Sequence, residues 1–255
     1  MANLMLHRGS RQVSREELAR VRAPEATPTW FPLAHGEVVN RVEETLGQAG
    51  FRVARSEYGL ARGDQRLFGV MDLASTITPG VTLAVGIRNS TDKSLPIGFA
   101  AGSRVLVCDN LAFCSEVVVS RKHTRFGEQR FVEALARACE GLVVFREQEA
   151  RRIEILQNTD LGDTRAESLI LRAWDQEIIS HRQVGAVLRE WREPERPAFA
   201  PRNAWSLFNA FTEVMKPRQR SNAQKFSHDT ILLNDLFSRE VGLGVARETP
   251  LLMGA

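Results

Sequence analysis

The middle third of the chain, residues 81–124, places the strongest constraint on the fold. Apolar, β-branched segments alternate there with short polar clusters, which read Arg88-Asn89-Ser90-Thr91-Asp92-Lys93-Ser94, Cys108-Asp109-Asn110 and Arg121-Lys122-His123-Thr124. The alternation indicates consecutive strands, and short connections between strands favour antiparallel neighbours. Polar loops held by a rigid sheet are also where binding and catalytic residues concentrate. The region therefore predicts an antiparallel sheet and the location of a functional site.

The segments before residue 81 are predicted to add two strands to the sheet, and a helix is predicted before these strands. Residues 51–61 and 65–73 have the pattern of a β-hairpin that turns at Gly63-Asp64. Apolar residues at helical spacing predict a helix over 36–46. Within the middle third, separate strands are expected over 81–87, 97–101, 104–108 and 116–120.

The sequence pattern changes after Thr124 and becomes helical. Residues 126–157 carry apolar side chains at a period of 3.6 without a proline, which predicts one long helix. A second helical segment covers 165–191 and breaks at Ser180, a residue type that often begins a helix. A third helix is expected over 203–215.

The predicted fold class is therefore α+β: a curved antiparallel sheet with a preceding helix and a long following helix, then a mostly helical C-terminal part. The chain is expected to divide into a basic N-terminal arm, an α+β core, a helical C-terminal subdomain and a C-terminal tail, at 1–30, 31–160, 161–230 and 231–255. Within the arm, Ser14 and Glu17 have the spacing of a capping box, which predicts a short helix.

Composition restricts the class of protein. With 43% hydrophobic and 25% charged residues, the chain resembles ordinary globular proteins. Its apolar stretches are too short and too interrupted to cross a bilayer, so a cytoplasmic protein without membrane contact is expected. Three cysteines are an odd number, which argues against a disulfide framework and for reduced thiols.

The charge is unevenly distributed, although the net charge is only +3. Five arginines lie between Arg8 and Arg22, and residues 216–225 carry four basic side chains and no acid. Local basic surfaces of this kind are compatible with a polyanionic partner, and equally with a solvated face.

Several segments together resemble a family of phage- and plasmid-borne proteins known as domain of unknown function 932. These segments are residues 30–35 (WFPLAH), 67–69 (LFG), 88–94 (RNSTDKS), 104–111 (RVLVCDNL), 122–124 (KHT) and 203–213 (NAWSLFNAFTE). The chain has Thr91 where the family commonly has histidine, and Lys93 where glycine is common. Membership implies a role in DNA transactions, and the order helix, sheet, long helix is similar to the core of Rad-fifty-two-like single-strand annealing proteins.

The leading functional hypothesis is a non-enzymatic protein that binds single-stranded DNA, as a homo-oligomeric ring or filament, and anneals strands in recombination. Basic strand residues would hold phosphates, while nearby aromatic rings such as Phe68, Phe99, Phe113, Phe126 and Tyr58 would stack on bases. The candidate binding residues are Arg88, Asn89, Lys93, Arg104, Arg121, Lys122 and His123. Asn89 would fix turn geometry or donate a hydrogen bond. The alternative is that the arginines pair with surface acids and the aromatic rings belong to the core.

Two enzymatic or metal-binding alternatives rest on weaker patterns. Cys108, Asp109, Cys114 and His123 offer zinc ligands, but the spacing lacks the C-x2-C pair that makes such signals strong. Asp64, Asp72, Asp92 and Asp109 would serve a metal-dependent hydrolase if the sheet gathered them. No catalytic residue, metal or cofactor is predicted, and a non-catalytic interaction module is the third alternative.

Overall fold

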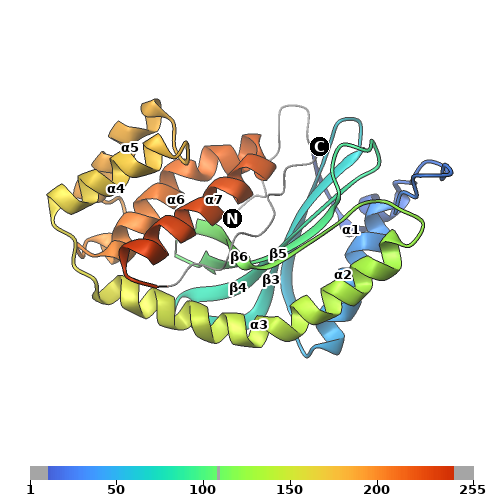
Figure 1. Cartoon of the computed structure of the whole chain (residues 1–255), viewed down its shortest axis with the longest axis horizontal. Helices are drawn as coiled ribbons and strands as arrows, with labels where there is room; N and C mark the ends of the chain where they lie inside the picture. The colour runs from blue at the N-terminus through green and yellow to red at the C-terminus, as the bar shows by residue number, and fades with distance from the viewer. Residues whose placement is uncertain (1–10, 108–109, 244–255) are drawn as a thin grey trace.

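The computed structural model describes residues 11–107 and 110–243 and shows an α+β fold (Figure 1). Its six described strands form one antiparallel sheet in the order of the chain. They are β1 (Arg11–Val13), β2 (Val53–Ala61), β3 (Arg66–Thr78), β4 (Val81–Ser90), β5 (Ile97–Val105) and β6 (Asn110–Arg121). The predicted fold class is confirmed, including the helix before the sheet and the long helix after it.

Tight turns set the register of the first hairpins. β2 and β3 pair from Ala61 opposite Arg66 onward, and the connection carries positive φ at Arg62, Gly63 and Asp64. Pro79-Gly80 joins β3 to β4, and Gly80 has φ +80°, where glycine has no steric penalty. The predicted hairpin with its turn at Gly63-Asp64 is therefore confirmed.

Two helices cover one face of the sheet. They are α2 (His35–Gln48) and α3 (Gly127–Asn158), and α3 runs along the sheet from α2 toward the C-terminal helices (Figure 1). A row of paired residues on this face, Tyr58, Gly69, Ile87, Phe99 and Val119, crosses five strands. Burial of the apolar members of this row and of its neighbours holds the helices to the sheet.

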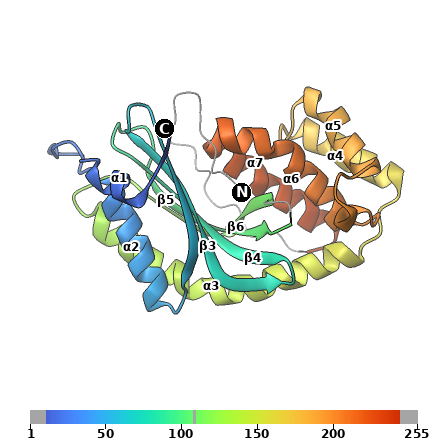
Figure 2. The ribbon, with the colours of Figure 1, turned by 180° about the vertical axis from the view of Figure 1, so that it is seen from behind.

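Among the described residues, helices cover the opposite face of the sheet at one end. The strands bend so that the start of β6 lies beneath α6 (Ala204–Ser221) and α7 (Ala223–Glu240), as Figure 2 shows. Asn110 donates from Nδ2 to Asn209 Oδ1 at 3.0 Å, and the Phe113 amide donates to Thr230 Oγ1 at 3.2 Å. Between α3 and α6 lie α4 (Asp163–Asp175), α5 (His181–Arg192) and the short 3-10 helix η1 (Pro197–Phe199).

Several predicted boundaries differ in the structure. The segments expected at 97–101 and 104–108 are not separate strands, since β5 continues through Gly102 and Ser103 and ends at Val105, and residue 108 lies outside the described residues. The described part of the N-terminal arm joins the core, because β1 pairs with β2 and α1 (Arg15–Arg20) packs on α2. The expected start of the tail at residue 231 falls inside α7. No helix in the described residues is long and apolar enough to span a membrane.

Candidate functional site

The seven predicted binding residues do not form one surface. Arg88 and Arg104 lie on the face of the sheet that points away from α2 and α3. Successive side chains of a strand point to alternate faces, and both arginines are on the same face as Gly86 and Ala84 of the β4–β5 ladder. Asn89 points to the other face, toward α2. Lys93, Arg121, Lys122 and His123 lie at the end of the sheet where β4 and β6 finish.

Arg104 is an internal residue rather than a surface cation. Its side chain is 2% exposed, and Nε donates to Asp72 Oδ1 at 2.7 Å. A buried pair of this kind neutralises both charges, and its arginine is not available to a phosphate. The prediction that Arg104 binds nucleic acid does not fit this placement.

Asn89 links β4 to the start of α2 through His35. Its Nδ2 donates to the Leu33 carbonyl at 2.9 Å and to His35 Nδ1 at 3.0 Å. Because His35 Nδ1 accepts, Nε2 carries the proton and donates to the Asp64 carbonyl at 2.9 Å. Burial lowers the pKa of His35, which keeps the imidazole neutral. Asn89 therefore donates hydrogen bonds that hold the start of α2 to β4, rather than fixing the turn after β4.

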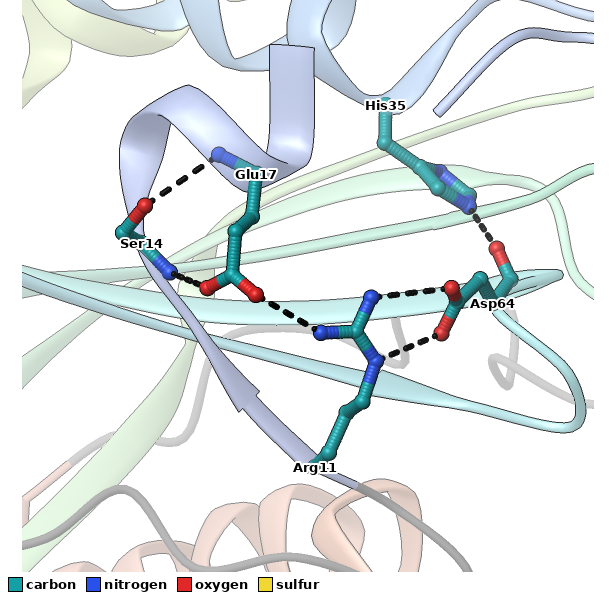
Figure 3. A network of polar contacts seen from close by, with 5 residues as sticks. All are labelled: Arg11, Ser14, Glu17, His35 and Asp64. Atoms are coloured by element: carbon teal, nitrogen blue, oxygen red, sulfur yellow. Dashed lines mark hydrogen bonds and ion pairs between the residues drawn. The ribbon is translucent and has the colours of Figure 1, made fainter. Parts of the chain in front are cut away.

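A surface network continues from Asp64 to the N-terminal elements (Figure 3). Arg11 donates from Nε and Nη2 to the two carboxylate oxygens of Asp64, at 3.1 and 2.9 Å, and from Nη1 to Glu17 at 3.0 Å. Glu17 also completes the capping box with Ser14, which confirms the predicted helix start. The hydrogen bonds with Arg11 lower the pKa of Asp64.

His123 lies buried between the chain entry and the end of β6. Its ring meets the Trp30 ring edge-on at a centroid distance of 6.4 Å, and its carbonyl accepts from the Phe31 amide at 3.0 Å. Both ring nitrogens are buried, next to backbone groups of Phe31 and Leu95. Burial, with a smaller contribution from nearby His35, lowers the pKa of His123. A neutral, buried imidazole supports the fold here and does not hold a phosphate.

Near His123, at the end of the sheet, five side chains are partly or fully exposed, and we call them the basic–aromatic patch: Trp30, Lys93, Lys122, Arg125 and Phe126. Lys93 Nζ lies 5.0 Å from the centroid of the Trp30 ring, and the Arg125 guanidinium lies 5.9 Å from that of Phe126. Phe126, at the start of α3, is 56% exposed. Cations stacked on exposed rings combine charge with a flat apolar surface.

The patch carries unneutralised positive charge. Within residues 11–107 and 110–243, Lys93, Lys122 and Arg125 make no ion pair with an acid. The nearby acids are already paired, Asp92 with Arg66 at 2.9 Å and Glu128 with Arg41 at 3.0 Å. Arg121 lies half-buried beside the patch and donates back to the Ser120 carbonyl at 2.7 Å.

The backbone of Lys93 explains one departure from the family pattern. Lys93 has φ +65°, in the left-handed region that glycine adopts without penalty. Glycine is the residue that the family resemblance led us to expect at this position. A lysine in this conformation adds a charge to the patch at some steric cost to the turn.

The metal-site hypotheses find no support among the described residues, where no group of three or more His, Cys, Asp or Glu side chains is placed to hold a metal. Asp64, Asp72 and Asp92 each pair with a different arginine. Cys114 donates to the Ala101 carbonyl, in the middle of the sheet. Phe113, next to Cys114, and Arg121, at the end of β6, have pairing partners that lie five residues apart on β5. Five residues of strand span roughly 17 Å, so Cys114 and His123 are far from each other. Cys108 and Asp109 fall outside the described residues.

Sequence reasoning missed the pairing that creates the patch. Trp30 and Lys93 are distant in the chain. Contacts with His123, including the hydrogen bond from the Phe31 amide to the His123 carbonyl, hold the entry segment at the end of β6. The family resemblance indicated that the WFPLAH segment is important. The residues that it contacts could be identified only from the fold.

The structure thus defines an α+β protein with an open antiparallel sheet and a basic, aromatic surface at one end of it. The chain belongs to the family described as Domain of unknown function (DUF932), whose model matches residues 27–237. Comparison with curated proteins and with solved structures found no match.

Proposed function

We propose that this protein binds single-stranded nucleic acid, with single-stranded DNA as the first ligand to test, through the basic–aromatic patch. The observation that carries the proposal is the contact of unpaired cations with partly exposed rings, Lys93 on Trp30 and Arg125 on Phe126. Single-strand binding surfaces combine these features, because phosphates need positive charge and unpaired bases stack on aromatic rings.

The proposed interface is smaller than the sheet-wide groove that the sequence suggested. Tyr58, Phe99 and Phe113 are buried, so these rings cannot stack on bases. Arg66 and Arg104 are paired with aspartates. Phe126 keeps its proposed stacking role, and Lys93 and Lys122 keep their proposed contacts with phosphate.

Annealing in recombination, an origin in phages or plasmids, and a cytoplasmic location are further parts of the proposal. Likeness to Rad-fifty-two-like annealing proteins rests on the order of elements, in which a helix precedes the sheet and a long helix follows it. Annealing requires that phosphates are held while base edges stay accessible for pairing. Binding through the patch would meet the first requirement.

The test is a fluorescence-anisotropy titration of a labelled single-stranded oligonucleotide at about 50 and 200 mM salt. We expect binding that weakens steeply with salt, since each phosphate contact releases a counterion. The double substitution Lys122→Ala with Arg125→Ala should weaken binding by about tenfold or more and make it less dependent on salt. Phe126→Ala should weaken binding without changing the salt slope.

The matched control removes two arginines from α5, Arg182→Ala with Arg189→Ala, which are exposed and far from the patch in sequence. This control has the same net charge as the patch variant and should bind like the unmodified protein. Equal loss in both variants would show a nonspecific charge effect and contradict the patch. Absence of binding at low salt would contradict the function itself.

A second candidate is a non-catalytic module that associates with itself. Leu171 and Trp174, about one turn apart on α4, are 54% and 48% exposed, which is unusual for large apolar side chains. Self-association through α4 would be compatible with the oligomer expected of an annealing protein. A mass measurement in solution, with and without oligonucleotide, tests this candidate.

A further inference from the structure

Arg88 is a cation for which the described part of the chain provides no counter-charge. It lies on β4, on the sheet face opposite α2 and α3, between Phe68 of β3 and Gly98 of β5. Its Nε and Nη2 atoms are buried and have no hydrogen-bond partner. The contrast with Arg104 on the same face is direct, because Arg104 pairs with Asp72.

Glycine in β5 creates the space that Arg88 occupies. A Cβ atom at Gly98 would lie 2.7 Å from Arg88 Nε and 2.8 Å from its Cγ. The side chain therefore lies flat across the β5 backbone, toward Ser120, which is the partner of Gly98 on β6. Any other residue at position 98 would displace the guanidinium from this place.

The two unpaired atoms form one functional edge of the guanidinium. Nε and Nη2 point in the same direction and bind two oxygens of one anion side by side. Arg11 uses the same two atoms to hold both oxygens of Asp64 at 3.1 and 2.9 Å (Figure 3). Within residues 11–107 and 110–243, no group pairs with this edge of Arg88, which is buried against the sheet. Nη1 is not among the buried atoms without a partner, so the guanidinium lies at the boundary with solvent.

An arrangement of this kind is costly for the folded protein. Burial alone lowers the pKa of Arg88 to about 10, since no neighbouring charge opposes it. Charged groups that are buried without a partner destabilise a fold, and they persist where function requires them. An anion that binds the free edge would remove this cost.

We propose that Arg88 and the surface beside Gly98 form a binding site for one phosphate group, which places two oxygens on Nε and Nη2 when the guanidinium turns this buried edge toward solvent. The position favours a phosphate of a bound strand, because Ser120 lies two strands from Arg88, about 10 Å, and directly precedes Arg121 and Lys122. A strand bound at the patch can therefore extend a phosphate onto this face. Assignment to nucleic acid rests on the proposed function, whereas the anion site itself does not.

The first experiment measures thermal unfolding in sodium phosphate against sodium chloride of equal ionic strength. Phosphate stabilises proteins in general, so the quantity of interest is the difference between the unmodified protein and Arg88→Met. We expect about 10 mM phosphate to raise the Tm of the unmodified protein by a few degrees more than that of Arg88→Met. Without phosphate, Arg88→Met should melt at a higher temperature than the unmodified protein, because it removes an unpaired buried charge.

Arg88→Lys is the second variant, and Arg182→Met is the control. Arg88→Lys keeps the charge but loses the paired donors, so its response to phosphate should be close to that of Arg88→Met. Arg182→Met should respond like the unmodified protein. An equal response to phosphate in all four proteins would overturn the proposal.

The second experiment repeats the oligonucleotide titration with Arg88→Met, for which we expect affinity to fall about tenfold. If the phosphate response depends on Arg88 and the unmodified protein binds no oligonucleotide, the anion site is supported and the proposed function fails. If oligonucleotide binds but Arg88→Met changes neither binding nor the phosphate response, the function is supported and this site is overturned.

Discussion

At the scale of single residues, the family segments are joined by buried polar contacts. Asn89 from the RNSTDKS segment meets His35 from the WFPLAH segment, and His123 from the KHT segment lies against Trp30. Both histidines are buried and their pKa values are lowered, so both are neutral in the folded protein at neutral pH. The three segments therefore support one structure beneath the basic–aromatic patch.

Burial of the two histidines predicts a loss of stability in mild acid. In the unfolded chain each imidazole titrates near pH 6.5, whereas the folded protein resists protonation. Stability is then complete above about pH 6.5 and falls as the pH decreases toward the lowered pKa, by at most about 1.4 kcal/mol per pH unit for each histidine. Urea unfolding at pH 7.5, 6.0 and 5.0 measures this slope.

His123→Met provides the comparison for the pH dependence. Replacement of His123 by an apolar side chain of similar size removes the buried titratable ring and should largely preserve the packing around it. Its stability should fall less between pH 7.5 and 5.0 than that of the unmodified protein. A slope as steep as that of the unmodified protein would assign the effect to other groups.

At the scale of elements, glycine is needed at one position of the sheet and is unfavourable at one position of the long helix. Gly102 in β5 lies against β6, where a Cβ atom would be 2.3 Å from the Ala112 carbonyl oxygen. Gly141 in α3 has open space around the same position and an ordinary helical backbone. One glycine is required by the close approach of two strands, whereas the other only weakens its helix.

Alanine at these two positions should have opposite effects on stability. Gly102→Ala should lower the free energy of unfolding by about 1–3 kcal/mol or more, because backbone atoms of β5 and β6 must move apart. Gly141→Ala should raise it by about 0.5–1 kcal/mol, because alanine favours the helix. Chemical denaturation of both variants checks the prediction, and a neutral Gly102→Ala would show that the sheet is looser than described.

At the scale of the whole molecule, the helices after α3 share a core with the sheet. Asn234 of α7 donates to the Phe113 carbonyl of β6 at 2.6 Å, and the Phe113 ring lies against Gly86 of β4. Between β5 and α3, Ser103 and Arg152 both donate to the buried Glu149. These contacts join the parts that the sequence suggested as a core and a helical subdomain.

The shared core predicts a single unfolding transition. Calorimetry should give equal calorimetric and van't Hoff enthalpies for the unmodified protein. Phe113→Ala should lower the free energy of unfolding by about 3–5 kcal/mol and still give one transition, because both parts lose the same contact. Two separate transitions would show that the helical part folds as an independent domain.

Much of the fold follows from local patterns. The hairpin over β2 and β3, the long α3 and the helix start at Ser180 appear in the structure where alternation, period and capping predict them. The predicted strand boundaries were wrong where contacts between residues distant in the sequence determine the structure. At Gly102, the close packing of β6 keeps β5 continuous through small residues. No helix was predicted over 223–240, although α7 covers this range.

The sequence by itself determined the fold class, because hydrophobic periods of two and of 3.6 residues are local properties of the chain. It also indicated which polar clusters matter. Only the tertiary structure decided what each cation does, because the residues on neighbouring strands determine whether a charged side chain of a sheet is paired. Asp72 neutralises Arg104, the rings of Trp30 and Phe126 lie beneath Lys93 and Arg125, and nothing in the described chain binds the Nε and Nη2 atoms of Arg88.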